Sequence, residues 1–337
     1  MGKLKGAIVG FGQVAEKAHV PAFKADSRFE IVAVVENLAE RKALGEATFH
    51  NVRSYSSLEA LFAQEPSLDF VDIATPPFLH ARQALLALRR GCHVLCEKPL
   101  TLQPGEFAEL ESRASEAGRA LFTVHNWAHS PQWLKIFELA RSGVLGVLRR
   151  ASLEVLRTKP AASAMPGDWR RQASLAGGGI LVDHGWHNLY LIHRLLGSAI
   201  SRVSVERFEA PGPGEAEDEV AVRLDLASRA QAFLRLSWRA QVRSNSAEIA
   251  GDRGTLRLDE AGLSLSAAGR PSETFAFPQK LSQGSAHPEW FASMLQDFQE
   301  AVENPPSRAR NLEEARFCVE AISQAYKAAR VGSPSSS

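Results

Sequence analysis

The sequence contains little cysteine: Cys92, Cys96 and Cys318 are the only three among 337 residues. An odd and sparse set cannot build a disulfide framework, and these three lack the neighbouring ligands of a zinc site. We therefore expect the protein in a reducing compartment, the cytoplasm, and we expect no metal.

The sequence also lacks an excess of charge of either sign, and it lacks long apolar runs. Its 39 lysines and arginines balance 38 aspartates and glutamates, which argues against the basic face of a nucleic-acid or anionic-membrane binder. No stretch approaches the roughly 18 uncharged apolar residues of a membrane span. The apolar run at 7–9 is too short for a secretory signal. We expect neither a nucleic-acid partner nor a membrane partner.

What is present is enough apolar material for a folded protein, because 45% of the residues are hydrophobic and only 23% are charged. Domains usually contain about 100 to 200 residues, so a chain of this length predicts two.

The first third alternates short apolar runs with longer helical patterns, which is typical of βαβ units around a parallel sheet. Predicted strands cover residues 5–9, 29–35, 70–74, 93–96 and 120–124, with a weaker one at 52–55. The helical pattern at 77–91 ends at a glycine, which can adopt the left-handed conformation that stops a helix. Residues 1–124 are therefore predicted to form an α/β doubly wound domain.

The remainder shows one long helix at 131–142, followed by strands that succeed one another without helices between them. These strands are predicted at 147–156, 200–208, 220–226, 231–238, 247–250 and 254–258, with closing helices at 288–302 and 312–329. The pattern predicts an α+β domain over 125–331 with a largely antiparallel open sheet, and a flexible tail at 332–337. Such open sheets often pack against another subunit, so we expect a homodimer or homotetramer formed through this sheet.

The first predicted strand runs into the pattern G-x-G-x-x-A, formed by Gly10, Phe11, Gly12, Gln13, Val14 and Ala15. Gly10 would permit a tight turn, Gly12 would let the backbone approach a pyrophosphate, and Ala15 would keep the following helix close to the sheet. The helix N-terminus favours negative charge. We expect Gly10 to Val14 to bind a dinucleotide.

Glu36 follows the second predicted strand directly. A carboxylate there can accept hydrogen bonds from the adenosine ribose and would repel a 2′-phosphate, which favours NAD over NADP. Alternatively, Glu36 is a solvated residue at the strand end, and the nearby Arg41 and Lys42 are partners for a phosphate.

Two further segments follow strands of the first domain. Thr75 and Pro76 begin a loop where ligands bind in such sheets, although a plain turn before a helix explains the prolines equally well. Glu97 and Lys98, followed by a proline, come after the strand at 93–96, and we expect both to contact the cofactor. Lys98 would offer its charge and three donors to a substrate oxygen in the crevice where a nicotinamide lies, or it is a surface lysine.

A glycine triplet at 177–179 precedes Asp183 and His187. In a helix these two residues stand at i and i+4 and share a face, which suits an acid/base pair, because histidine titrates near neutral pH. A pair that only stabilises the start of the helix is the alternative. His184 and His193 lie off that face, and no further ligands stand at a spacing that suits a metal.

Together the three motifs resemble those of the Gfo/Idh/MocA oxidoreductases, the family of glucose-fructose oxidoreductase and inositol dehydrogenase. The likeness extends over nearly the whole chain. It implies a Rossmann domain, an α+β domain, and NAD(P)-dependent oxidation or reduction of a sugar, cyclitol or nucleotide sugar. It further implies that Lys98 is the catalytic lysine, that Asp183 is its acidic partner and that His187 is the general acid/base. In the family the bond from this lysine to the following proline is commonly cis.

The substrate contacts are predicted from aromatic and hydrogen-bonding residues near these motifs: Trp127, Trp169 and Arg170. Two alternatives to a dehydrogenase remain open. Some relatives bind the dinucleotide as regulators without chemistry, and others use a transient oxidation by NAD to cleave glycosides.

Overall fold

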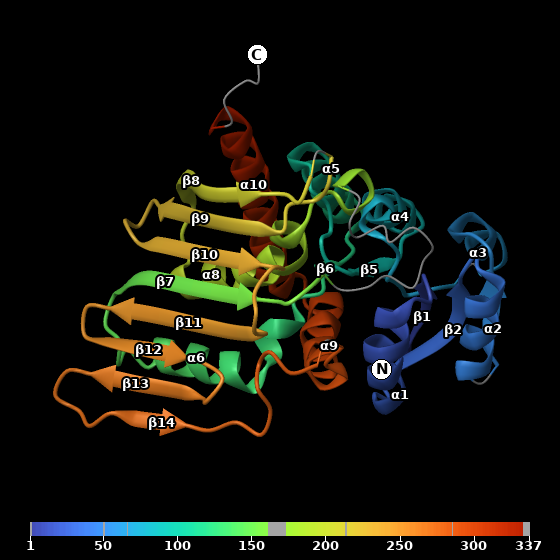
Figure 1. The fold of residues 1–337 in the computed structure, drawn as a ribbon. Helices are drawn as coiled ribbons and strands as arrows, with labels where there is room; N and C mark the ends of the chain where they lie inside the picture. The colour runs from blue at the N-terminus through green and yellow to red at the C-terminus, as the bar shows by residue number, and fades with distance from the viewer. Residues whose placement is uncertain are drawn as a thin grey trace, which may run out of the picture. The chain divides into compact units, whose positions relative to one another are not determined.

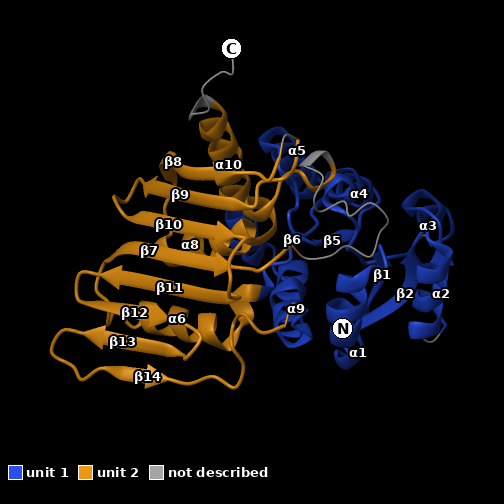
Figure 2. Cartoon of the chain, in the orientation of Figure 1, with its two compact units in different colours: residues 1–126, 286–315 blue, residues 127–285, 316–337 orange. Residues whose placement is uncertain are grey.

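The computed structural model describes residues 2–49, 51–65, 67–160, 173–212, 214–284 and 286–332. The chain forms two units (Figure 2). Unit 1 comprises Met1–Asn126 and Ala286–Ala315, and unit 2 comprises Trp127–Ser285 and Arg316–Ser337. The sequence pattern predicted one boundary near residue 124, whereas the contacts within the chain also assign the segment 286–315 to unit 1.

Unit 1 contains a six-stranded parallel sheet in the order β3-β2-β1-β4-β5-β6. The strands are β1 (Leu4–Val9), β2 (Phe29–Val35), β3 (Arg53–Tyr55), β4 (Phe70–Ile73), β5 (His93–Cys96) and β6 (Leu121–Thr123). Every residue of β4 and β5 is buried, as expected of central strands covered on both faces. The predicted doubly wound sheet is confirmed.

The helices of unit 1 are η1 (Ala15–His19), α1 (Val20–Ala25), α2 (Ala39–Thr48), α3 (Leu58–Gln64), α4 (Pro77–Arg89), α5 (Pro104–Ala117), α9 (Pro288–Glu303) and η5 (Pro305–Ser307). Local sequence explains several of their ends. The Ser57 side chain accepts the N–H of Ala60 at the start of α3. Gly118 stops α5 in the left-handed conformation.

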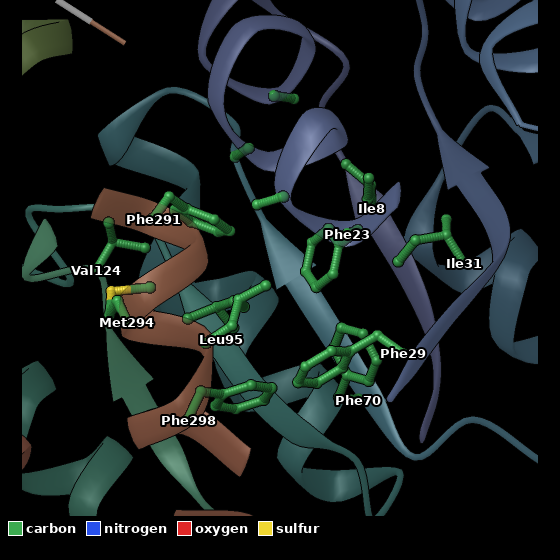
Figure 3. Packing of buried hydrophobic residues seen from close by; sticks show 14 of the residues in the cluster. Ile8, Phe23, Phe29, Ile31, Phe70, Leu95, Val124, Phe291, Met294 and Phe298 are labelled. Carbon is green, nitrogen blue, oxygen red and sulfur yellow. The ribbon is translucent and has the colours of Figure 1, made fainter. Parts of the chain in front are cut away.

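A phenylalanine-rich core joins the sheet of unit 1 to α9, which follows it by more than 160 residues in the chain (Figure 3). Phe298 of α9 packs against Phe29, Phe70 and Phe122, with ring centroids 5.7 to 6.2 Å apart. Burial of each such ring contributes about 1.5–3 kcal/mol to folding. This apolar contact explains why 286–315 belongs to unit 1.

Unit 2 contains an eight-stranded sheet in the order β14-β13-β12-β11-β7-β10-β9-β8 (Figure 1). The strands are β7 (Leu148–Leu156), β8 (Ile200–Glu209), β9 (Glu219–Leu226), β10 (Gln231–Ser237), β11 (Ser244–Gly251), β12 (Gly254–Leu258), β13 (Leu263–Ala267) and β14 (Glu273–Phe275). All neighbours are antiparallel except β7 and β10. The predicted α+β class is confirmed, and β13 and β14 extend the predicted sheet.

The remaining helices are η2 (Asn126–His129), α6 (Pro131–Arg141), α7 (Ala173–Ala176), η4 (Leu181–Gly185), α8 (Trp186–Leu196) and α10 (Arg308–Gly332). Two segments, η1 and η4, are single π-helical turns, a form that is rare and often occurs at functional sites. None of the three cysteines forms a disulfide, as predicted. Among the helices of the described ranges, none combines the length and the hydropathy that crossing a bilayer requires.

Candidate active site

Four of the predicted binding residues follow strands of the parallel sheet in unit 1. Gly10 follows β1, Glu36 follows β2, Thr75 comes after β4, and Glu97 follows β5. Because parallel strands end at the same edge, the structure brings these four residues to the carboxyl edge of the sheet, where open α/β sheets bind ligands.

The two glycines of the first motif have different surroundings. Gly10 has φ +88°, and a Cβ at this position would lie 2.8 Å from Thr75 Cγ2 and 2.9 Å from the carbonyl carbon of Ala74. Only glycine fits this turn without strain. At Gly12 no other heavy atom lies within 4 Å of the position that a Cβ would take. The space beside Gly12 suits the close approach of a pyrophosphate.

The Glu36 carboxylate organises the loop after β1. Its Oε2 accepts the N–H of Phe11 at 2.9 Å, and its Oε1 accepts the N–H groups of Asn37 and Leu38 at 2.8 and 2.9 Å. Arg41 instead pairs with Glu16 at 2.9 Å. A carboxylate offers about four acceptor positions, so Glu36 retains capacity for one further donor.

Phe11, Gln13 and Val14 of the same motif differ in how far their side chains are exposed to solvent. The Phe11 side chain is fully buried and lies 3.5 Å from the Cβ position of Gly45. Val14 is half-buried and Gln13 is exposed. Phe11 therefore holds the loop to the domain, Val14 packs against the edge of its core, and only Gln13 is open to solvent.

The loops after β4 and β5 are tied together by His80 of α4. Its ring nitrogens lie 2.7 Å from the carbonyl oxygens of Thr75 and Pro99. The Thr75 hydroxyl donates to Gln83 Oε1 at 2.6 Å, and Pro76 comes immediately before α4. Burial lowers the pKa of His80, although both ring nitrogens face acceptors. His80 thus positions the backbone on both sides of the predicted cofactor edge.

A buried ionisable network lies beneath Lys98. His19 of η1 contacts Asp72 Oδ2 through Nδ1 at 2.8 Å and Glu97 Oε1 through Nε2 at 3.0 Å. The other carboxylate oxygen of Glu97 accepts the backbone N–H of Lys98 at 3.0 Å. The His19 ring stacks on Phe291 at 4.0 Å. The half-buried Lys98 therefore stands on a backbone that Glu97 and His19 hold in place.

The charges in this network follow from its contacts. Burial lowers the pKa of His19, but Asp72 and Glu97 outweigh it and raise this pKa to about 9. Burial raises the pKa of Glu97, but the hydrogen bond and charge of His19 lower it overall. At neutral pH a His19 imidazolium therefore lies between two acidic side chains. The Lys98–Pro99 bond is cis, as the family resemblance implies.

This network predicts a loss of stability at alkaline pH. Because the folded pKa of His19 is raised from 6.5 to about 9, its stabilising effect is complete below about pH 6.5 and is lost as the pH rises through 9. The urea-unfolding free energy of the wild type should fall over this range, and that of His19→Gln should not show this fall.

His93→Gln provides a control. Burial lowers the pKa of His93 to about 4, so the contribution of His93 to the unfolding free energy changes with pH only below neutral pH. This variant should keep the alkaline fall of the wild type. An identical alkaline fall in His19→Gln would show that His19 is not protonated in the folded protein.

In unit 2 the glycine triplet is held by Glu217. The Glu217 carboxylate accepts the N–H of Gly179 at 2.8 Å and that of Leu181 at 3.1 Å, and its carbonyl accepts the N–H of Ile180 at 2.9 Å. A Cβ on Gly179 would overlap the Glu217 carbonyl oxygen. The buried Glu217 therefore positions the segment that leads to Asp183.

Asp183 lies in the π-turn η4, and His187 lies in the first turn of α8. The segment from Asp183 to His187 is helical, but it passes from the wider π-turn η4 into the α-helix α8. Asp183 Oδ2 lies 3.3 Å from Nδ1 of His184, which the spacing placed on another face.

The His187 side chain is 7% exposed and is oriented by two aromatic residues. Its ring stacks on Trp127, with centroids 4.6 Å apart and planes at 7°. Its Nδ1 lies 3.1 Å from the hydroxyl oxygen of Tyr190, which also accepts the N–H of Trp127 at 3.0 Å. Trp127, expected to contact substrate, thus covers one face of His187.

The structure brings together Gly10, Glu36, Thr75 and Glu97 in unit 1, and Trp127, His187 and Tyr190 in unit 2. Trp169 and Arg170 lie outside the described residues. Sequence reasoning missed four polar residues that support the site: His19, Asp72, Tyr190 and Glu217. Asp72 carried a signal, because a carboxylate inside an otherwise apolar strand needs a buried partner.

Comparisons with known proteins show the family of both domains. Residues 4–125 match the GFO_IDH_MocA family, described as "Oxidoreductase family, NAD-binding Rossmann fold", and residues 133–257 match "GFO/IDH/MocA C-terminal domain". An uncharacterised oxidoreductase of Synechocystis is 30% identical over 266 residues, 75% of this chain and 70% of that protein.

Two relatives have more specific names. D-glucoside 3-dehydrogenase of Escherichia coli is 33% identical over 216 residues, 62% of this chain and 59% of that protein. The crystal structure of GenD2 from gentamicin A biosynthesis, in complex with NAD, superposes with a TM-score of 0.83 at 26% identity, covering 99% of this chain and 96% of that one.

Proposed function

The chain belongs to the GFO/IDH/MocA family of NAD-binding oxidoreductases, and on that premise we propose that it transfers a hydride between NAD and a carbinol of a sugar, cyclitol or nucleotide sugar. The observation that carries the proposal is the carboxyl edge of the parallel sheet. There the Gly10 turn, the Glu36 carboxylate and the Lys98 backbone held by Glu97 follow the ends of β1, β2 and β5 of the same parallel sheet.

The residues fit a dinucleotide at this edge. Gly12 leaves its backbone open to a pyrophosphate, and Glu36 has acceptor capacity for a ribose hydroxyl. When bound, the nicotinamide supplies the hydride acceptor or donor.

His187 is the proposed general base for oxidation, accepting the substrate hydroxyl proton at Nε2. For this, its Nδ1 carries the other hydrogen and donates it to the Tyr190 hydroxyl oxygen at 3.1 Å. That oxygen has two lone pairs and can also accept the N–H of Trp127. In the reduction direction, His187 donates the proton instead.

Lys98 would stabilise the developing alkoxide with its charge, because preorganised charge lowers the barrier where negative charge forms. Asp183 would orient the substrate and balance the charge of Lys98. We propose Lys98, Asp183 and His187 as the catalytic residues, acting on one hydroxyl group.

The proposal is tested by mixing the protein with NAD and panels of aldoses, inositols and nucleotide sugars while absorbance at 340 nm is followed. We expect net NADH formation with at least one of them. Glycoside cleavage without net NADH would favour transient oxidation. Cofactor binding without any turnover across the panels would favour a regulator.

The cofactor preference is tested in the same assay with NADP. Two charges close together near a protein surface interact by about 1–4 kcal/mol, so Glu36→Gln should lower the preference for NAD by about tenfold or more. Glu30→Gln is the control, because Glu30 is an exposed acidic residue near the start of β2, the strand that Glu36 follows. Turnover with NADP alone in the wild type would contradict the role of Glu36.

We also propose that the protein acts in the cytoplasm as a homodimer or homotetramer formed through the sheet of unit 2. Support comes from the alternating burial along β9 and β10, which leaves one face of this sheet more exposed than the other.

A further inference from the structure

Three buried hydrogen-bond donors at one end of the sheet of unit 2 have no acceptor in the described part of the chain. They are Nε of Arg157, Nε1 of Trp238 and Nδ2 of Asn245. The three residues are only 3–4% exposed. Buried donors are nearly always satisfied, so three neighbouring exceptions call for an explanation.

The three residues lie on adjacent strands and on one face of the sheet. Arg157 and Trp238 directly follow β7 and β10, which run parallel, and Asn245 is the second residue of the antiparallel β11. Val155 of β7 pairs with Leu236 of β10 and with Asn245 of β11, so the side chains of Val155, Leu236 and Asn245 project to one face of the sheet. Because side chains alternate along a strand, Arg157 and Trp238 share that face.

Arg157 is also a buried cation without an ion pair to any carboxylate of the described chain. Its Nη1 donates to three neutral acceptors: the carbonyls of Leu156 at 2.8 Å and Ser244 at 3.1 Å, and Asn245 Oδ1 at 2.8 Å. Burial lowers the pKa of Arg157 to about 10, which leaves it charged at neutral pH. The charges of Asp183 and Glu260 favour the guanidinium from a distance and that of Arg243 opposes it. A buried charge without a direct ion pair is costly, and a bound anion would provide one.

This face also carries the candidate catalytic segment of unit 2. A Cβ on Gly185 of η4 would lie 3.2 Å from Leu236 Cδ1, so η4 packs on the face that holds Arg157 and Trp238. Asp183 of η4 is close enough for its charge to raise the pKa of Arg157. The unmatched donors therefore lie near Asp183.

The available groups define the chemistry of the ligand. Guanidinium, indole and amide N–H groups are all donors, and the guanidinium adds a positive charge. A neutral hydroxyl would leave the guanidinium without a direct ion pair, whereas a carboxylate or phosphate offers several acceptor oxygens and a negative charge. We propose that Arg157, Trp238 and Asn245 bind an oxyanion of the substrate, so that the substrate is an acidic sugar. That the bound anion is part of a substrate rests on the proposed function.

The test measures binding without turnover, by calorimetric titration of the NADH-saturated protein with D-glucuronate, α-D-glucose 1-phosphate and D-glucose. We expect one acidic sugar to bind about 10- to 100-fold more tightly than D-glucose, and the tighter of the two identifies the oxyanion as carboxylate or phosphate. Arg157→Gln should abolish this preference and leave D-glucose affinity unchanged. Arg235→Gln, an exposed arginine on β10, is the matched control.

Trp238→Phe keeps the ring and removes only the N–H, so it tests the site even where Arg157→Gln does not fold. It should weaken the acidic sugar roughly 3- to 10-fold and leave D-glucose unaffected. Equal affinities of acidic and neutral sugars in the wild type, or an unchanged preference in both variants, would overturn the proposal. A preference for acidic sugars in a protein that never reduces NAD would support the anion site and contradict the proposed hydride transfer.

Discussion

The variant His187→Ala should lose about 10²- to 10⁴-fold in kcat, because a positioned general acid or base contributes that much to a proton transfer. His187 is held by its stack on Trp127 and by the contact of Nδ1 with Tyr190, and the proposed proton acceptor is Nε2. The effect is measured as kcat and KM for the sugar identified in the 340 nm screen. NADH affinity, measured by fluorescence titration, should stay within a fewfold of the wild type.

The matched control is His193→Ala, because His193 lies in the same helix but packs against Phe317. Its kcat should stay close to that of the wild type. Unchanged turnover in His187→Ala would remove His187 from the chemistry and limit Trp127 and Tyr190 to packing.

Lys98→Met should lower kcat by about 10²- to 10³-fold, the effect of removing one preorganised group that stabilises an oxyanion. Methionine keeps much of the length of lysine and loses the charge. Glu97 remains hydrogen-bonded to His19, so the loop should keep its conformation. Lys3→Met is the control, because Lys3 is exposed and precedes β1 at the opposite edge of the sheet.

The double variant tests whether Lys98 and His187 act on the same hydroxyl group. Residues that act as a unit are strongly non-additive, so Lys98→Met with His187→Ala should lose much less than the product of the two single losses. A multiplicative loss would indicate that the two residues act on separate steps.

Much of the fold was predictable from local patterns. The strands at 29–35, 93–96 and 254–258 were predicted with the bounds that the structure has, because buried parallel and alternating strands carry direct apolar signals. The segment Leu263–Ala267 was not predicted. It has only five residues and two leucines, which is too short an alternation to distinguish a strand from a loop.

The supporting shell of the site was less predictable. His19 looks like an ordinary helical residue until the fold places it between Asp72 and Glu97, which are 53 and 78 residues away in the chain. The widening of the helix at η4 was also invisible, because the spacing of Asp183 and His187 suits a regular α-helix as well.

The sequence by itself determined the class of both domains, the turn that requires Gly10 and the placement of the candidate cofactor residues after strand ends, because these depend on side-chain period and on backbone sterics within a few residues. Only the tertiary structure decided that the contacts of Phe298 assign α9 to unit 1 and that His19 supports Glu97. It also decided that Arg157 Nε, Trp238 Nε1 and Asn245 Nδ2 lie close together with no acceptor among the residues that the structure describes. Burial, ion pairing and unmet hydrogen bonds arise between residues distant in the chain, so no local pattern records them.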